Sequence, residues 1–164
     1  MKRILLVSCG GLGHGGVQSV IMNIVRGLSN KYIFDIVLFT SERRYYDDEF
    51  ESYGGKIFRV PHYEGKIWIR KKIDYYVRWM SISPNIKKIV IENGPYVAIH
   101  CNNVFESGIC LKSVRKLVPI RVCHAHVKAE SGNPILRRLN NLYRSYILNY
   151  ATDLIGCSEE ANKS

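Results

Sequence analysis

Short apolar runs alternate with amphipathic stretches along the whole chain. The predicted strands are the runs rich in aliphatic, β-branched and aromatic residues, at 4–7, 34–40, 56–60, 96–100, 120–126 and 153–157. The predicted helices lie between them, at 17–28, 42–53, 66–80, 85–92, 105–117 and 134–150. This alternation predicts an α/β fold: a Rossmann-like three-layer sandwich with a mostly parallel sheet of about six or seven strands and right-handed crossovers.

A glycine-rich turn separates the first strand from the first helix. Five glycines lie between Gly10 and Gly16. Glycine suits a backbone that takes positive φ or comes close to a ligand. The unpaired N–H groups at the following helix start form an anion site suited to phosphate. A tight turn without a ligand is the structural alternative, although five glycines exceed what a turn needs.

The turn also matches the Gly-x-Gly-x-x-Gly pattern of dinucleotide-binding folds, from Gly11 to Gly16. That function needs an acidic residue about 20 residues later to hold the ribose. The first acidic residue after the second strand is Glu42, 31 positions beyond Gly11. Because the acid comes late, the pattern alone is weak support for a nicotinamide or flavin site.

Ligands of parallel sheets bind beyond the carboxyl ends of the strands. Four of the five histidines fall on that edge of the predicted sheet: His14, His100, His124 and His126. His124 and His126 alternate by two, so both face one side of their strand. A metal cluster with nearby cysteines is an alternative, but no cysteine pair has zinc-type spacing. Strand-end histidines are more typical of hydrogen-bonding or acid–base groups facing a substrate.

Composition limits the protein class. The 164 residues fit one domain, and no apolar run approaches the ~20 residues that span a membrane. The five cysteines have no Cys-x-x-Cys spacing, which favours free thiols in a reducing cytoplasm. The net charge of +10 indicates an anionic partner, either nucleic acid, a phosphorylated substrate or an acidic membrane surface, unless it serves solubility alone. No recognition module for nucleic acid is present.

The predicted helix Lys66–Met80 mixes aromatic and apolar residues with arginines and lysines. Basic amphipathic helices with Trp and Tyr lie in the interface of anionic membranes, and an ordinary core-facing helix is the alternative. Ser158 is a good helix N-cap, and nothing ends the helix that would follow it. We therefore expect the chain to be a fragment of a longer protein.

Several stretches together resemble a known family. These are Gly15–Leu28, His100-Cys-Asn-Asn, Arg121-Val-Cys-His-Ala-His126 and Ala151-Thr-Asp-Leu-Ile-Gly-Cys-Ser-Glu-Glu160. Their order and spacing resemble the opening of family 4 retaining glycosyltransferases of the GT-B fold, which include bacterial capsular, exopolysaccharide and lipopolysaccharide enzymes. The resemblance covers nearly the whole chain.

In that family, two Rossmann-like domains face each other across a cleft. The N-terminal domain binds the acceptor, and the C-terminal domain binds the nucleotide sugar and carries two glutamates seven residues apart. The resemblance implies that residues 1–164 are the N-terminal acceptor-binding domain, one half of a GT-B fold, and inactive alone. It implies a cytoplasmic hexosyltransferase of polysaccharide biosynthesis, peripheral on the inner face of the plasma membrane, with no cofactor, metal or nucleic-acid partner. The alternative is a stand-alone Rossmann-like module that binds a nucleotide or another anionic ligand.

The resemblance also implies roles for individual residues. Gly15 and Gly16, with Gly13 beside them, match the glycines that approach the donor diphosphate and sugar. His126 and His124 compete for the position near the reacting centre, and His126 is favoured because it is nearer the strand's carboxyl end. The residues proposed for the saccharide or polyprenyl-diphosphate-linked acceptor are His14, His100, Asn102, Asn103 and Glu130.

Overall fold

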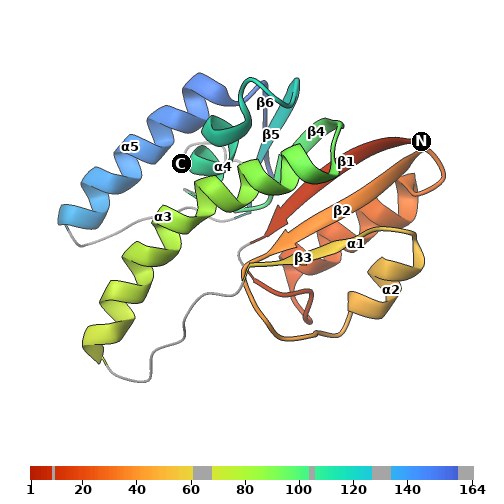
Figure 1. Ribbon diagram of the computed structural model, residues 1–164, viewed down its shortest axis with the longest axis horizontal. Helices are drawn as coiled ribbons and strands as arrows, with labels where there is room; N and C mark the ends of the chain where they lie inside the picture. The colour runs from red at the N-terminus through yellow and green to blue at the C-terminus, as the bar shows by residue number, and fades with distance from the viewer. Residues whose placement is uncertain (9, 61–67, 104–105, 127–133, 159–164) are drawn as a thin grey trace.

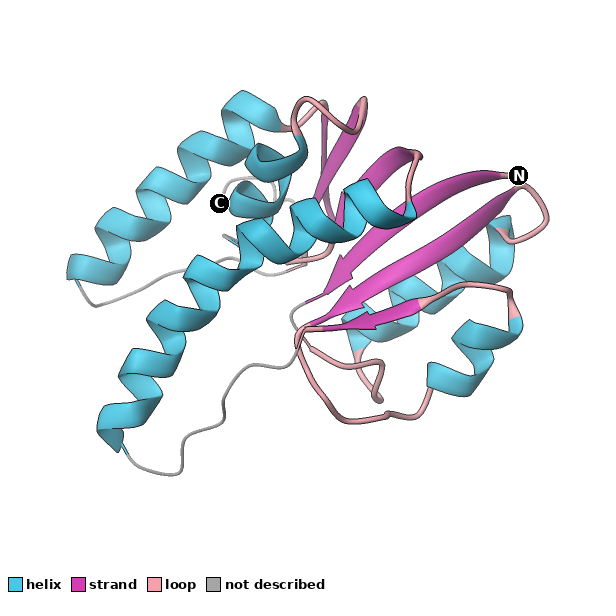
Figure 2. Ribbon diagram, viewed as in Figure 1, coloured by secondary structure: helices cyan, strands magenta, loops and turns pink. Residues whose placement is uncertain are grey.

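The computed structural model of the chain contains one sheet with helices on both of its faces (Figures 1 and 2). It describes residues 1–8, 10–60, 68–103, 106–126 and 134–158, with the backbone alone described for 68–79 and 134–136. The strands are β1 Lys2–Ser8, β2 Tyr32–Leu38, β3 Ile57–Arg59, β4 Tyr96–Cys101, β5 Ile120–Ala125 and β6 Asp153–Gly156. The helices are α1 Gly16–Leu28, α2 Asp47–Ser52, α3 Trp68–Asn93, α4 Glu106–Val114 and α5 Pro134–Tyr150.

The six described strands are all parallel, in the order β3-β2-β1-β4-β5-β6. The chain adds strands on one side of β1 and then crosses over through α3 to add strands on the other side. The winding therefore reverses between β1 and β4. In such sheets the crevice at the reversal, beyond the carboxyl ends of the strands, is the usual place for a ligand.

Two apolar clusters hold the three layers together. Alternate residues of β1 point to opposite faces, so Leu6 belongs to one cluster and Leu5 to the other. The Leu6 cluster joins the sheet to α1 and α2 through Ile21, Met22, Val25 and Phe50. The Leu5 cluster joins it to α3, α4 and α5 through Ile82, Ile86, Ile109, Leu111 and Tyr143. The predicted sandwich and its six strands are confirmed.

The long helix α3 corrects one prediction. Pro84 does not open a separate helix; it lies inside a helix that runs from Trp68 to Asn93. An internal proline costs about 3 kcal/mol, because it removes an N–H donor and crowds the preceding turn. Ile82 and Ile86 on both sides of it are completely buried against the sheet. Their burial offsets that cost and keeps the helix continuous.

Three predictions fall on residues that the structure does not describe. The side chains of 66–79, on which the membrane-interface prediction rests, are outside the described set. So are Glu130 and the helix expected after Ser158. None of the described helices is both long enough and apolar enough to cross a bilayer.

Candidate functional site

The glycine-rich turn lies at the carboxyl end of β1, and α1 begins directly after it. Gly15 is the N-cap of α1, in extended conformation with φ −173° and ψ 162°. No described side chain caps the helix start. The N–H groups of the first turn are therefore left for another acceptor, and the helix dipole favours a negatively charged one.

The backbone conformation does not explain all of these glycines. Among the described glycines only Gly54 has a positive φ, and it lies elsewhere, after α2. A Cβ atom placed on Gly13 or Gly16 would meet no atom within 4 Å. By contrast, a Cβ on Gly11 would lie 2.8 Å from Cγ of Arg44. Neither packing nor φ therefore requires glycine at positions 13 and 16, where a side chain would face open space.

Three of the four predicted edge histidines meet one another. The register of β4 and β5 pairs His100 with Val122, so the side chain of His124 lies on the same face, one step nearer the carboxyl edge. Nε2 of His100 is 3.3 Å from Nδ1 of His124. The rings of His124 and His126 are 4.1 Å apart between centroids. The group, His100, His124 and His126, is called the histidine row below.

Burial determines the charge of this row. Burial and, to a smaller extent, the neighbouring His124 and His126 together lower the pKa of His100 to about 4. Desolvation also lowers the pKa values of His124 and His126. All three rings are therefore uncharged near neutral pH. They can donate and accept hydrogen bonds there, but they do not present a fixed positive charge to a phosphate.

Asn102 determines which nitrogen of His126 carries the proton. The amide Nδ2 of Asn102 donates to the carbonyl oxygen of His100 at 3.4 Å, so its Oδ1 is the acceptor. Nε2 of His126, 3.3 Å from that Oδ1, is then the N–H donor. Nδ1 of a neutral His126 keeps its lone pair and can accept a proton or a hydroxyl hydrogen bond.

The two predicted asparagines are buried, with exposed fractions of 5% for Asn102 and 8% for Asn103. The main-chain N–H of Asn102 donates to Val7 at 2.9 Å, which joins β1 to the end of β4. The carbonyl oxygen of Asn103 accepts from the Ser107 hydroxyl at 2.6 Å. These hydrogen bonds connect the end of β4 to β1 and to the start of α4. Contact of either asparagine with an acceptor stays a prediction.

His14 lies apart from the row in its contacts. Its ring packs against the Tyr45 ring with centroids 3.8 Å apart and planes tilted by 37°, and no described ring contact joins it to the other three histidines. Neither Tyr45 nor its neighbour Tyr46 is among the site residues expected from the sequence. The rule that singled out strand ends could have found them, because they follow the carboxyl end of β2 on the same edge as the glycine-rich turn.

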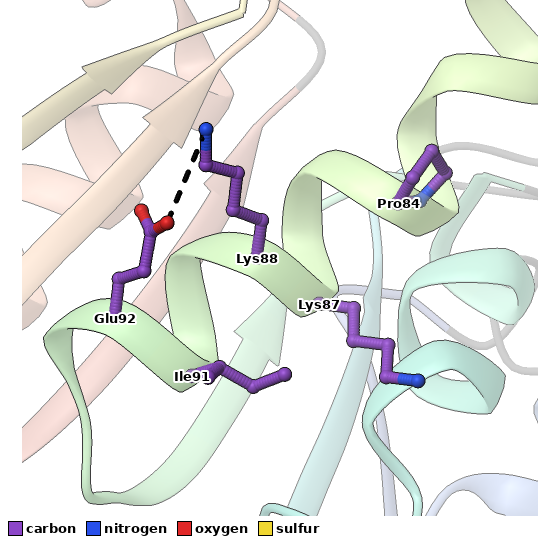
Figure 3. A pocket seen from close by; sticks show the side chains of 5 residues that line it. All are labelled: Pro84, Lys87, Lys88, Ile91 and Glu92. Carbon is purple, nitrogen blue, oxygen red and sulfur yellow. Dashed lines mark ion pairs between the residues drawn. The ribbon is translucent and has the colours of Figure 1, made fainter.

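The remaining chemistry of the described residues is limited. No three described His, Cys, Asp or Glu side chains are grouped so that they could hold a metal ion. No disulfide joins any of the four described cysteines. One shallow pocket of about 330 Å³ lies on α3, lined by Pro84, Lys87, Lys88, Ile91 and Glu92 (Figure 3). All of these residues belong to a single helix, so the pocket is not part of the strand-end site.

No family model matches the chain. In sequence, the chain is 32% identical over 166 aligned positions to a protein of Bacillus subtilis (strain 168) named "Putative glycosyltransferase EpsF". The similarity covers 99% of this chain and 40% of that protein. The chain thus spans about two fifths of the length of this relative.

Solved structures match the fold at low identity. The Anabaena protein Alr3699/HepE, solved with UDP-glucose, superposes with a TM-score of 0.66 at 12% identity over 99% of this chain and 39% of its own. MurG of Acinetobacter baumannii superposes with a TM-score of 0.55 at 10% identity, over 95% of this chain and 41% of the MurG chain. UDP-GlcNAc 2-epimerase of Methanocaldococcus jannaschii superposes with a TM-score of 0.55 at 12% identity, over 99% of this chain and 41% of the epimerase chain.

The structural matches include an epimerase, so fold alone does not select a reaction. The sequence similarity to EpsF favours a glycosyltransferase over an epimerase. Together, the fold and the sequence similarity support a glycosyltransferase domain of the GT-B type.

Proposed function

We propose that the chain is the N-terminal, acceptor-binding domain of a family 4 retaining glycosyltransferase. The complete enzyme transfers a hexose from a nucleotide sugar to a polysaccharide or a lipid-linked saccharide. The observation that carries the proposal is the uncapped start of α1, with open space at Gly13 and Gly16. The glycosyltransferase relative supports the reaction class.

In this proposal the donor is held mainly by a second domain, and its diphosphate faces the start of α1 across a cleft. Gly15 and Gly16 let the phosphate oxygens approach the main-chain N–H groups, which a side chain would hold away. Negative charge on the diphosphate rises as the glycosidic bond to the leaving group breaks. Fixed N–H dipoles stabilise that charge without reorganising. Closure of the cleft completes the site and excludes water.

The histidine row supplies uncharged polar groups beside this anion site. His126 is the outermost of the three along its strand, and Asn102 fixes its proton on Nε2. We assign it the contact with a hydroxyl of the donor sugar near the reacting centre. His124 behind it orients the ring and is the second candidate for that contact. An uncharged ring does not compete with the N–H groups for the diphosphate.

The acceptor and the membrane are proposed from charge. Arg137, Arg138 and Arg144 of α5 are exposed, and the helix contains no acidic residue. This supports an anionic acceptor such as a polyprenyl-diphosphate-linked saccharide, and a peripheral position on the inner face of the plasma membrane. His14, His100, Asn102, Asn103 and Glu130 are the proposed acceptor residues.

A matched pair of variants in the complete enzyme tests the glycine role. Both Gly16 and Gly27 are in α1, and a Cβ at either would meet open space. Gly16→Val should lower kcat/KM for the nucleotide sugar at least tenfold at unchanged Tm, because the added side chain blocks the diphosphate. Gly27→Val, at the other end of the helix, should keep both values. Equal activity of the two variants would contradict the proposal.

The coding sequence gives a quicker test of the domain assignment. We expect the frame to continue beyond Ser164 into a second α/β domain with two glutamates seven residues apart. A stop codon directly after Ser164 would favour the alternative, a stand-alone module that binds an anionic ligand. Turnover of a nucleotide sugar by residues 1–164 alone would also contradict the assignment.

A further inference from the structure

An exposed aromatic cluster lies beside the glycine-rich turn. Its members are His14, Tyr45 and Tyr46. The ring of Tyr45 packs against His14 at a tilt of 37° and meets Tyr46 edge-on, with ring centroids 3.8 Å and 4.8 Å away. Despite these contacts, Tyr45 is 64% exposed. It is a large aromatic ring held against two others with most of its surface in water.

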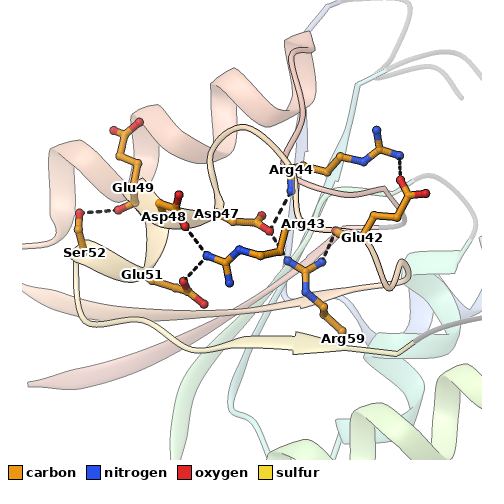
Figure 4. A network of polar contacts seen from close by, with 9 residues as sticks. All are labelled: Glu42, Arg43, Arg44, Asp47, Asp48, Glu49, Glu51, Ser52 and Arg59. Atoms are coloured by element: carbon orange, nitrogen blue, oxygen red, sulfur yellow. Dashed lines mark hydrogen bonds and ion pairs between the residues drawn. The ribbon is translucent and has the colours of Figure 1, made fainter.

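The segment that carries Tyr45 is fixed at several points. The main-chain N–H of Tyr46 donates to the carbonyl oxygen of Leu12 in the glycine-rich turn at 2.8 Å. The buried carboxylate of Asp47 accepts from the main-chain N–H of Arg44 at 3.0 Å and forms an ion pair with Arg59 (Figure 4). Arg59 also donates to the carbonyl oxygen of Glu42 at 2.6 Å. The ring of Tyr45 is therefore presented from an ordered backbone.

Packing does not account for this arrangement. Core aromatic residues of the same half of the molecule, such as Phe50, are fully buried and contribute apolar area. Tyr45 buries little, while fixing its side chain still costs conformational entropy. An exposed aromatic ring on an ordered loop beside a candidate site is the pattern of a binding surface.

The chemistry around the ring suits a saccharide. The face of an aromatic ring carries partial negative charge and attracts the slightly positive C–H groups of a pyranose face. Glu42 and Arg44, on the same segment, are more than half exposed and form an ion pair with each other. The Glu42 carboxylate can accept hydrogen bonds from sugar hydroxyls, and the Arg44 guanidinium can donate hydrogen bonds to them. The site is open to water, which suits a ligand whose other hydroxyls stay hydrated.

We propose that Tyr45, backed by His14, is the platform on which a pyranose ring of the saccharide acceptor stacks. This proposal rests on the proposed function, which makes the bound sugar an acceptor. It places that sugar next to the start of α1, where the donor diphosphate would lie. It adds a binding residue, Tyr45, and the kind of contact that it makes. Glu42 and Arg44 are the polar groups that orient the ring.

Saturation-transfer NMR on the 164-residue chain tests the platform. The probes are methyl α-D-glucopyranoside, methyl β-D-galactopyranoside and N-acetylglucosamine, with uridine and UDP measured separately. We expect transfer to at least one sugar, reduced at least fivefold by Tyr45→Ala and retained by Tyr45→Phe, which keeps the ring. His14→Ala should reduce it about two- to threefold, because Tyr45 loses its support.

The matched control is Tyr53→Ala, which removes another partly exposed tyrosine, at the end of α2. It should leave the sugar signals unchanged. Far-ultraviolet circular dichroism of each variant shows that the fold is kept. The proposal is overturned if no sugar receives saturation, if Tyr45→Ala keeps the signal, or if uridine alone depends on Tyr45, since that would make the ring a nucleobase platform.

The two proposals fail in different ways. Binding of UDP is read from amide shifts at Gly16, and binding of sugar from its dependence on Tyr45. Sugar signals that depend on Tyr45, without activity loss in Gly16→Val, would remove the donor role of the glycine-rich turn and keep the platform. Loss of activity in Gly16→Val, with sugar signals independent of Tyr45, would remove the platform alone.

Discussion

The two ends of the sheet treat buried polar groups in opposite ways. At the amino end, the fully buried carboxylate of Asp35 accepts hydrogen bonds from Arg3 at 2.7 and 3.1 Å. It also accepts from the Tyr96 hydroxyl at 2.7 Å and from the main-chain N–H of Lys56 at 2.8 Å. At the carboxyl end, the half-buried ring of His100 contacts the buried ring of His124. Burial lowers the pKa values of both rings, and no counter-ion among the described residues stabilises a charge on them.

The difference separates stability from binding. A buried charge stabilises a fold only when donors surround it, and Asp35 joins β1, β2 and β4 with the segment before β3 in that way. The uncharged rings of the histidine row, by contrast, keep hydrogen-bonding capacity for a ligand. The amino end therefore fixes the strands, and the carboxyl end holds groups that can bind. Three measurements test this contrast.

The largest effect should come from Asp35→Ala. The variant leaves the Arg3 guanidinium and the Tyr96 hydroxyl without their shared acceptor. We expect a loss of about 3–5 kcal/mol in the free energy of unfolding, measured by urea denaturation. As a control, Glu49→Gln breaks the solvent-exposed ion pair with Arg26 and should barely move the midpoint. A small effect of Asp35→Ala would mean that the amino end is not the stabilising one.

The next effect comes from comparing glycines of the two ends. A Cβ on Gly55, at the amino end, would lie 2.0 Å from the carbonyl oxygen of Phe34, so main chain must move. Gly55→Ala should cost about 2–3 kcal/mol. Gly13→Ala, in the open turn at the carboxyl end, should change stability by less than about 0.5 kcal/mol. Thermal melts of the two variants measure these stability changes. A large loss indicates that packing requires the glycine, and a negligible one leaves ligand access as the reason.

The smallest effect is a pH dependence of the histidine row. The folded pKa of His100, about 4, lies below the value near 6.5 that a histidine has in an unfolded chain. The unfolded state therefore binds the proton first. Stability from this residue is complete above pH 6.5, falls as the pH drops towards 4, and is level below that.

At pH 5 the loss from His100 should be of the order of 2 kcal/mol relative to pH 7. Urea denaturation of wild type and His100→Gln at both pH values isolates this contribution, because the variant has no ring to protonate. His14→Gln changes an exposed histidine and serves as the control. If the free energy of unfolding falls equally for wild type and His100→Gln between pH 7 and pH 5, burial does not lower the pKa of His100 in solution.

Much of the fold follows from local pattern. All six strands were predicted within about two residues of their observed ends, because each is a short apolar run between turn signals. Pro84 misled the prediction because a local rule for proline competes with burial of Ile82 and Ile86, which depends on the whole sheet. The segment 42–46 was predicted helical, yet only Asp47–Ser52 is helix, since Tyr46 hydrogen-bonds to the glycine-rich turn instead.

The site was predictable only in part. The strand-end rule brought His100, His124 and His126 to one edge, and the alternation by two placed them on one face. It could not separate His14 from the row, because the contact of His14 with Tyr45 joins segments about 30 residues apart. Asp35 was also missed, since its role depends on Arg3 and Tyr96, which only the folded sheet brings together.

Cys157 provides a labelling position at the carboxyl edge of the sheet. It is the exposed one among the four cysteines that the structure describes, and its thiol donates to the carbonyl oxygen of His126 at 3.1 Å. A maleimide dye should therefore react at Cys157 well before Cys101, Cys110 or Cys123. Its fluorescence would then report from directly beside the histidine row, so arrival of a ligand or closure of a second domain could be followed in real time without a tag.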